Sequence, residues 1–160
     1  MSFIVTGLPR SRTAWFAALF TALGKPCSHE LTKDCNSLSD FKSRLKLAGT
    51  ADSGVVLIKR TVNVPTVVIH RPVKHVVESL GVTDKKQIQF FEDMETNSLS
   101  ISGLHVTYCD IDERIHEIIS HCVGDLGDYY TVKMMQSFNI QRTNHNYSIT
   151  DWALNLVKEF

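Results

Sequence analysis

The sequence lacks an excess of either charge, because its 17 lysines and arginines are matched by 17 aspartates and glutamates. Proteins that bind nucleic acid or anionic membranes over a broad surface usually carry net positive charge, so the balance argues against both classes. Any anion site must therefore be a local cluster. The 160 residues are 43% hydrophobic and 21% charged, which predicts one packed domain, 1–160, without long disordered tracts.

Long apolar segments and a cysteine framework are also missing. No apolar run approaches the roughly 18 residues of a membrane-spanning helix. The chain starts with a short apolar run and lacks a basic segment followed by a cleavage site, so no secretory signal is expected. The four cysteines form no CxxC pair and are interpreted as free thiols: Cys27, Cys35, Cys109 and Cys122. These absences predict a cytoplasmic protein with neither membrane nor nucleic acid as a partner.

Short β-branched runs alternate with helical segments along the chain. Strands are predicted at residues 3–6, 55–58, 66–70 and 105–109, the second after a turn at Asp52-Ser53-Gly54. Helices are predicted at residues 13–23, 38–48, 72–80, 84–99, 129–138 and 149–157, and from an Asp110 or Asp112 cap to residue 123. Residues 25–36 are predicted as loop. The alternation predicts a three-layer α/β fold with a mostly parallel sheet of about four strands flanked by helices.

The loop after the first predicted strand carries the densest cluster of groups that bind anions. It reads Gly7-Leu8-Pro9-Arg10-Ser11-Arg12-Thr13 and leads directly into a helix. The helix start offers free backbone N–H groups and a positive dipole end, and ligands of such folds bind at the carboxyl ends of the strands. No Gly-Lys pair follows Gly7 as in a Walker A motif, which argues against an ordinary Mg-ATP hydrolase. A β–α turn with two solvated arginines is the alternative interpretation.

A second cationic group lies at the end of the predicted strand 66–70. His70 is interpreted as the residue that ends this strand, and Arg71 follows it. Ser79, on a helix that starts at Pro72, lies about two turns further on and near the face of Pro72. Arg71 and Ser79 could hold a second anionic group beside the first. The alternative is a helix-start arginine with an ordinary helical serine.

Together the two segments resemble the motifs of the sulfotransferase family, P-loop-like folds that use the donor 3'-phosphoadenosine 5'-phosphosulfate (PAPS). The first motif of that family reads roughly Pro-Lys/Arg-Ser-Gly-Thr-Thr-Trp/Leu, and this chain has Pro9-Arg10-Ser11-Arg12-Thr13-Ala14-Trp15. The second motif is an arginine at a strand end with a serine eight positions on, as at Arg71 and Ser79. The resemblance covers residues 2–80 and is closest to short sulfotransferase-like proteins of bacteria and phages.

The resemblance implies a set of cofactor-binding residues, with PAPS or its product PAP as co-substrate and no metal. Arg10, Ser11 and Thr13 would hold the 5'-phosphosulfate, Trp15 would stack near the adenine, and Arg71 and Ser79 would hold the 3'-phosphate. Pro9, Arg12 and Ala14 complete the loop. Arg12 replaces the usual glycine and either alters the loop backbone or enters the sulfate site, and Ala14 replaces a hydroxyl residue. Arg142 is a guess for a later basic segment of the family.

Sulfuryl transfer to a hydroxyl needs a base for the proton of the acceptor and a cation on the leaving phosphate. Arg10 is the candidate cation. Some bacterial sulfotransferases carry a glutamate after a turn like Gly24-Lys25-Pro26, so Glu30 is the candidate base, with His29 as an alternate or partner. An exposed loop pair is the alternative interpretation.

Three functions stay open at this stage. The first is a sulfotransferase-like enzyme that acts on a small-molecule nucleotide and an unknown hydroxyl or amine acceptor. The second is a non-catalytic module that binds a nucleotide or phosphate, and the third is a diverged nucleotide kinase. The acceptor, the role of residues 100–160 and the formation of a homodimer are left undecided.

Overall fold

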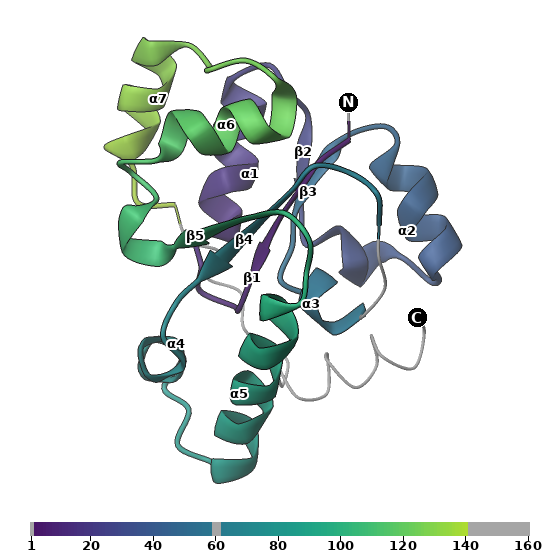
Figure 1. Cartoon of the computed structure of the whole chain (residues 1–160), viewed down its shortest axis with the longest axis vertical. Coiled ribbons are helices and arrows are strands. Elements are labelled where there is room, and N and C mark those ends of the chain that lie inside the picture. The colour runs from purple at the N-terminus through teal and green to yellow at the C-terminus, as the bar shows by residue number, and fades with distance from the viewer. Residues whose placement is uncertain (1, 59–61, 141–160) are drawn as a thin grey trace.

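The computed structural model describes residues 2–58 and 62–140. Its centre is a sheet of five parallel strands in the order β2-β3-β1-β4-β5 (Figure 1). The strands are β1 (Ile4–Gly7), β2 (Cys27–His29), β3 (Gly49–Ala51), β4 (Thr66–His70) and β5 (Leu104–Thr107). The predicted α/β class is confirmed, with five strands instead of about four.

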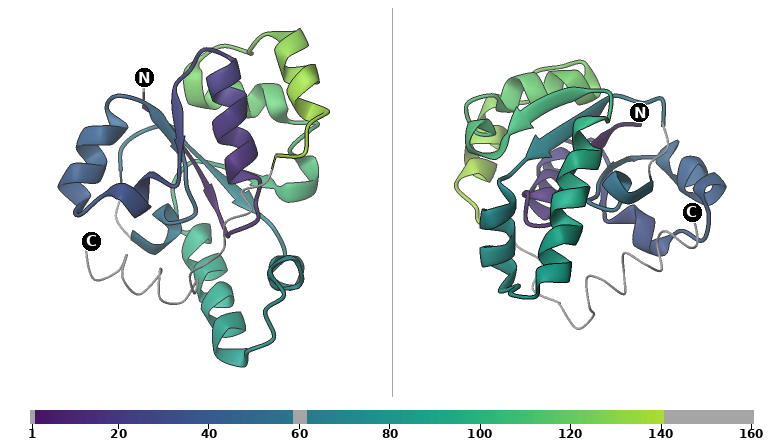
Figure 2. Two further views of the ribbon diagram at one scale, coloured as in Figure 1. Left: turned by 180° about the vertical axis from the view of Figure 1, so that it is seen from behind. Right: turned by 60° about the horizontal axis from the view of Figure 1, so that its bottom comes forward.

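Helices flank the sheet on both sides and give three layers (Figure 2). On one side, α1 (Thr13–Ala22), α6 (Ile115–Val123) and α7 (Tyr129–Gln136) pack on a core that includes Val5, Ile69 and Val106. On the other side, α3 (Val55–Ile58), α4 (Val73–Leu80) and α5 (Lys85–Leu99) gather around Leu8. A further cluster joins α2 (Leu38–Leu45) and the 3-10 turn Leu31–Asp34 to Ile4. The direction in which strands are added reverses at β1, because β2 and β3 lie on one side of it and β4 and β5 on the other.

Several helix ends follow from local hydrogen bonding. Ser37, Asp84 and Asp128 each accept a hydrogen bond from the backbone N–H three residues on, which satisfies a donor that the first turn leaves open. Gly81 ends α4 in the left-handed conformation, as the sequence predicts. Helix α1 is apolar on most of its surface, and Trp15 and Phe16 are among its buried residues. Burial of one such side chain stabilises the fold by about 1.5–3 kcal/mol.

The strand predicted at residues 55–58 is wrong, because Val55–Ile58 forms the short helix α3. Asp52 turns the chain just before it, since its Oδ1 accepts a hydrogen bond of 2.8 Å from the N–H of Gly54. All four residues of α3 are buried. A short apolar run reads the same in a buried helix as in a buried strand. The strand at this point of the chain is β3, which ends one residue before Asp52.

Two smaller predictions also need correction. The predicted loop 25–36 contains β2, a three-residue strand at the edge of the sheet that pairs with β3. Arg114, not Asp110 or Asp112, occupies the N-cap position of α6 and makes no side-chain cap, because the 3-10 turn Tyr108–Asp110 comes between β5 and the helix. The helix predicted at residues 149–157 lies outside the described residues. Within residues 2–58 and 62–140, no helix is long and apolar enough to cross a membrane.

Candidate functional site

The ends of β1 and β4 bring the two predicted motifs together. Gly7 is in register with Ile69, so the loop after β1 and Arg71 leave the sheet side by side. The Nη1 of Arg71 donates a hydrogen bond to the carbonyl oxygen of Arg10. Arg10 and Arg71, which the sequence predicts near the ends of different strands, are thus in direct contact.

Gly7 allows the close approach of these two strand ends. A Cβ atom at this position would lie 2.5 Å from the carbonyl oxygen of Ile69, closer than real Cβ contacts. The same Cβ would lie 3.3 Å from the Cβ of Ser11, so the loop curls back over its own start. A side chain at position 7 would separate β1 from β4 and open the loop.

Two left-handed residues shape the backbone of the loop. Arg10 has a φ of 66° and Arg12 a φ of 64°, a conformation that costs a non-glycine residue roughly 1–2 kcal/mol. Arg12 is the N-cap of α1 and gives the helix no side-chain cap. The N–H groups of the first helical turn have no partner inside the helix, and no acidic side chain lies in that turn. The loop therefore presents donors and a positive dipole end to an anion.

Buried polar atoms at this edge include two, on different strand ends, that have no hydrogen-bond partner in the described part of the chain. One is the hydroxyl of Ser11, a residue with 0% exposure, and the other is the Nε of Arg71. An unsatisfied buried polar group costs about 1–3 kcal/mol, so proteins rarely keep one without a ligand or water. The pair lies at the point where the sequence predicts an anion.

Tyr108 is a residue of this site that sequence reasoning missed. The guanidinium carbon of Arg71 lies 4.4 Å from the centre of the Tyr108 ring, a distance typical of a cation–π contact. Tyr108 follows β5, the strand next to β4, so its position at the same edge fixes it beside Arg71. The available signal was an aromatic residue near the end of the predicted strand 105–109.

The structure turns Arg12 toward Asp112, in the segment between β5 and α6, and not toward the interior of the loop. Its Nη1 lies 2.9 Å from Oδ1 of Asp112, and its guanidinium carbon lies 3.8 Å from the centre of the Trp15 ring. The left-handed φ means that Arg12 keeps a backbone conformation that glycine adopts freely. The loop backbone thus has the conformation that a glycine would adopt, and the guanidinium of Arg12 points away from the interior of the loop toward Asp112.

The prediction that Trp15 stacks on an adenine is wrong. Trp15 is only 2% exposed and belongs to the core between α1 and the sheet. Its Nε1 donates a hydrogen bond of 2.8 Å to the carbonyl oxygen of Met135 on α7. The guanidinium of Arg12 covers the ring, so no face is open to a ligand.

The other predicted loop residues lie at the helix start, and Ser79 is an exposed residue of α4. Pro9 and Ala14 are half-buried and Thr13 is buried. Ser79 is exposed on α4, beyond the carboxyl end of β4, and makes no hydrogen bond to Arg71 among the described contacts (Figure 1). The eight-residue spacing therefore does not by itself join these two side chains.

His29 contacts the helix start that follows the loop, whereas Glu30, the preferred candidate base, pairs with Lys33. The Nε2 of His29 lies 3.2 Å from the hydroxyl oxygen of Thr13, which ties the end of β2 to the start of α1. The carboxylate of Glu30 pairs with the ammonium of Lys33, and Glu30 has a left-handed φ of 56°. The contact with Thr13 makes His29 the stronger candidate for proton transfer.

Asp52 is a buried carboxylate at the carboxyl end of β3, next to β1. It accepts hydrogen bonds from the N–H of Thr32 at 2.7 Å, the hydroxyl of Thr32 at 2.8 Å and the N–H of Gly54 at 2.8 Å. Burial raises the pKa of Asp52 to about 6, while these hydrogen bonds act in the opposite direction. Its oxygens are occupied by protein donors, and Asp52 holds the segment after β2 against β3.

No cluster that could hold a metal ion occurs in the two described ranges. Arg142, the guess for a later basic segment, lies outside the described residues. Comparison of the chain with protein-family models, with curated proteins and with solved structures found no match.

Proposed function

We propose that this protein binds PAPS at the ends of β1 and β4 and transfers its sulfuryl group to a hydroxyl or amine acceptor. The observation that carries the proposal is the contact of Arg71 with the carbonyl oxygen of Arg10, beside the unpartnered hydroxyl of Ser11. These groups come from two neighbouring strand ends, where nucleotides bind in sheets of this kind. The resemblance of the two motifs to sulfotransferases supports the choice of donor.

The loop suits the 5'-phosphosulfate. The hydroxyl of Ser11 and the N–H groups at the start of α1 are donors without a partner inside the helix. Arg10 supplies the charge that balances the leaving phosphate. Arg71, in contact with the loop and with Tyr108, is suited to the 3'-phosphate. Trp15 and Ser79 are not needed for this arrangement.

The reaction moves one sulfuryl group and one proton. The oxygen or nitrogen of the acceptor forms a bond to sulfur as the bond between sulfur and the bridging oxygen of the 5'-phosphate breaks. The bonding electrons stay on that oxygen, and PAP leaves. His29 takes the proton of the acceptor, a role that its position against Thr13 supports. Donors fixed at the loop stabilise the charge that develops on the phosphate.

Calorimetric titration with PAP tests the binding half of the proposal. The wild-type protein should bind PAP, and Arg71→Ala should weaken binding by about 10- to 100-fold, the value of one or two charged hydrogen bonds. Arg44→Ala is the matched control, because Arg44 is a half-exposed arginine of α2 that pairs with Asp40. Equal PAP affinity in the wild type and Arg71→Ala, or no binding, would contradict the proposal.

Labelled sulfate tests the transfer half. Incubation with ³⁵S-labelled PAPS and a panel of alcohols, phenols and amines should label at least one acceptor. His29→Gln should lower the rate by about 10²- to 10⁴-fold while PAP affinity stays near that of the wild type. Glu30→Gln should leave the rate within about twofold, because Lys33 already holds Glu30. If Glu30→Gln abolished the transfer rate and His29→Gln did not, Glu30 and not His29 would be the base.

A non-catalytic module that binds a nucleotide or phosphate is the second candidate. The pairing of Arg12 with Asp112 favours it in one respect, because the cation that replaces the usual glycine is held outside the loop and adds no charge to the sulfate site. In that case PAP binds but no acceptor is labelled. A nucleotide kinase predicts instead Mg-dependent turnover of ATP, which the loop without a lysine does not favour.

A further inference from the structure

A chain of three side chains connects α5 to the two strands at the Arg71 end of the sheet. The Nδ1 of His70, the last residue of β4, lies 3.0 Å from Oε1 of Glu95 on α5. The Nε2 of His70 lies 2.6 Å from Nδ1 of His105 on β5. The Nε2 of His105 lies 2.7 Å from the carbonyl oxygen of Ile101. All four imidazole nitrogens are therefore in short polar contacts.

The ring geometry supports a true hydrogen bond between the two histidines. Their planes differ by 10°, and the ring centres are 4.9 Å apart. That separation exceeds the 2.6 Å between the two nitrogens by about two ring radii, as expected when both rings lie in one plane and the nitrogens face each other. The proton then lies on the line between the nitrogens, where a hydrogen bond is strongest.

Counting protons shows that the chain of side chains is incomplete when both imidazoles are neutral and Glu95 is ionised. The carbonyl of Ile101 only accepts, so Nε2 of His105 must carry a proton. The bond between the rings needs a second proton, and the bond between His70 and Glu95 needs a third. Two neutral imidazoles and a carboxylate hold only two such protons. The complete chain holds one more and is neutral overall, while its loss leaves two lone pairs facing each other.

The series of hydrogen-bonded side chains Glu95, His70 and His105 lies next to the proposed ligand site. His70 precedes Arg71, and β5 carries both His105 and the segment that leads to Tyr108. Backbone pairing of His70 with Thr107 places these groups on adjacent positions of the two strands. A loose His70 would therefore loosen the contact of Arg71 with the loop.

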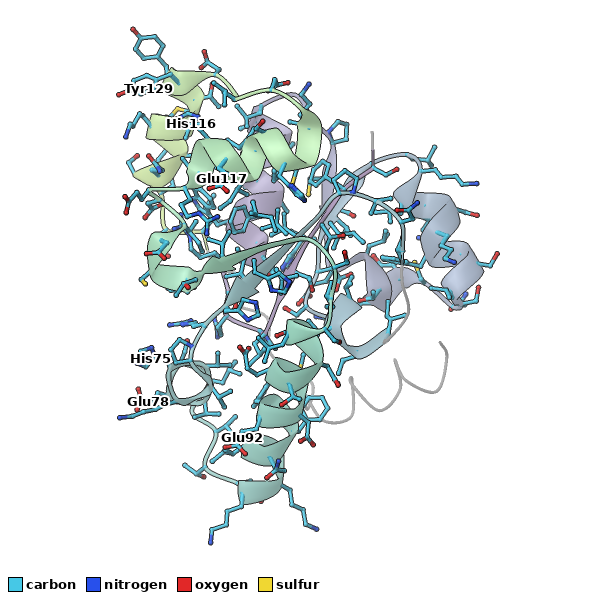
Figure 3. The ribbon with its side chains drawn as sticks, viewed as in Figure 1. His75, Glu78, Glu92, His116, Glu117 and Tyr129 are labelled. Carbon is cyan, nitrogen blue, oxygen red and sulfur yellow. The ribbon has the colours of Figure 1, made fainter. Side chains whose placement is uncertain are left out.

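The charged and polar neighbours of these three side chains come from α5, from β4 and from the segment before α6. Ser98 of α5 lies 3.4 Å from Oε2 of Glu95, and the Nη1 of Arg114, which precedes α6, donates to the carbonyl oxygen of His105 at 3.3 Å. Arg71 follows directly on β4. On α4, the labelled His75 and Glu78 point away from α5 (Figure 3). Glu95 is thus the acidic group that balances the extra proton.

We propose that Glu95, His70 and His105 form a proton-dependent latch that fixes α5 to the ends of β4 and β5 and positions Arg71 for its anion. The positioning role rests on the proposed function, whereas the latch does not. The latch is complete when the extra proton is bound and breaks when that proton passes to solvent as the pH rises. The three residues act through Arg71 and do not touch the reacting atoms.

Glu95→Gln separates this proposal from a purely structural role. The amide N–H of the new side chain can donate to Nδ1 of His70, so Nε2 of His70 can donate to His105 and His105 to Ile101. The chain is then complete with two neutral imidazoles, and it needs no extra proton. His105→Phe breaks the chain at every pH. His75→Gln is the matched control, because His75 is an exposed histidine of α4.

Nitrogen NMR of the histidine and arginine side chains, recorded between about pH 5 and about pH 8, detects whether the hydrogen bonds of the latch are present. In the wild type, the imidazole signals of His70 and His105 should shift together, and the Nε–H signal of Arg71 should move with them. In Glu95→Gln all three should stay constant, and in His75→Gln they should follow the wild type. Independent shifts of the two imidazoles, or the same shifts in Glu95→Gln, would overturn the latch. An Arg71 signal that does not change with pH would overturn the proposal that the latch positions Arg71.

PAP affinity measured over the same pH range tests whether the latch affects ligand binding. Because the phosphates of PAP titrate alike in every sample, the ratio of the wild-type affinity to that of Glu95→Gln is the measure. The ratio should fall by up to about fivefold toward pH 8, the value of one hydrogen bond. A constant ratio would contradict the coupling. Absence of PAP binding would refute the proposed function, and the NMR signals would still decide the latch.

Discussion

Asp52 and the Ser11–Arg71 pair are buried polar groups at the same edge of the sheet, and they differ in how fully they are hydrogen-bonded. Asp52 accepts three hydrogen bonds from Thr32 and Gly54. The hydroxyl of Ser11 and the Nε of Arg71 have no partner within the described residues. A satisfied buried group contributes to the fold, whereas an unsatisfied one lowers stability until a ligand binds. Mutations should therefore affect stability at the first group and ligand affinity at the second.

The largest expected effect is a loss of stability in Asp52→Ala. Removal of the carboxylate leaves the donors of Thr32 and Gly54 unsatisfied in a buried place, which should lower the free energy of unfolding by about 3 kcal/mol. Urea denaturation followed by circular dichroism measures the change. Asp34→Ala, at an exposed aspartate of the adjacent turn, should change it by less than about 0.5 kcal/mol. Equal losses of stability in Asp52→Ala and Asp34→Ala would contradict the view that the hydrogen bonds of Asp52 stabilise the fold.

The free energy of unfolding should depend on pH through the protonation of Asp52. Burial raises the pKa of this carboxyl from 3.8 to about 6, so the folded protein binds a proton that the unfolded chain has already released. The resulting stabilisation is complete below about pH 4 and is lost as the pH rises through about 6. Between these values the free energy of unfolding should fall by roughly 1–3 kcal/mol relative to Asp52→Asn. Parallel curves for the two proteins would contradict this.

Ser11→Ala should change stability and affinity in opposite directions. Removal of an unsatisfied buried hydroxyl should leave the free energy of unfolding unchanged or raise it by up to about 1 kcal/mol. The same change should weaken PAP binding by about fivefold, because one donor to the anion is lost. Ser43→Ala, at an exposed serine of α2, should alter neither quantity. A large loss of stability in Ser11→Ala would mean that its hydroxyl serves the fold.

The smallest effect is expected at the ion pair between Arg12 and Asp112. The carboxylate of Asp112 is 62% exposed, and exposed pairs contribute little. Asp112→Asn should therefore lower the free energy of unfolding by less than about 0.5 kcal/mol. If Arg12 is then free to reach the anion, PAP affinity should rise by about two- to threefold. An unchanged affinity would assign Arg12 to the packing on Trp15 alone.

Much of the fold follows from the sequence because the long elements have clear signals. Strand β4 is a β-branched run, and α4 follows Pro72 and ends at Gly81. Strands β2 and β3 have three residues each, too few for a periodicity to appear. The run Val55–Ile58 is equally apolar in either conformation, and the turn at Asp52 decides between them through a hydrogen bond to Gly54.

The candidate site was predictable where a residue acts through its backbone position. Gly7 and Arg71 stand at strand ends, and parallel strands bring such ends together. Contacts between side chains from distant segments were not predictable, as with Tyr108 under Arg71 and His29 against Thr13. Trp15 shows the same limit, because its burial depends on Met135, 120 residues further along the chain.

The contact between Arg71 and the carbonyl of Arg10 spans 61 residues of chain. The loop thus takes its final shape only after β4 has joined β1, so a partly folded chain or a short peptide with the loop sequence would lack the anion site. Ligand binding can therefore serve as a reporter for the last stage of folding. A refolding experiment that monitors PAP capture alongside helix formation should find the capture delayed.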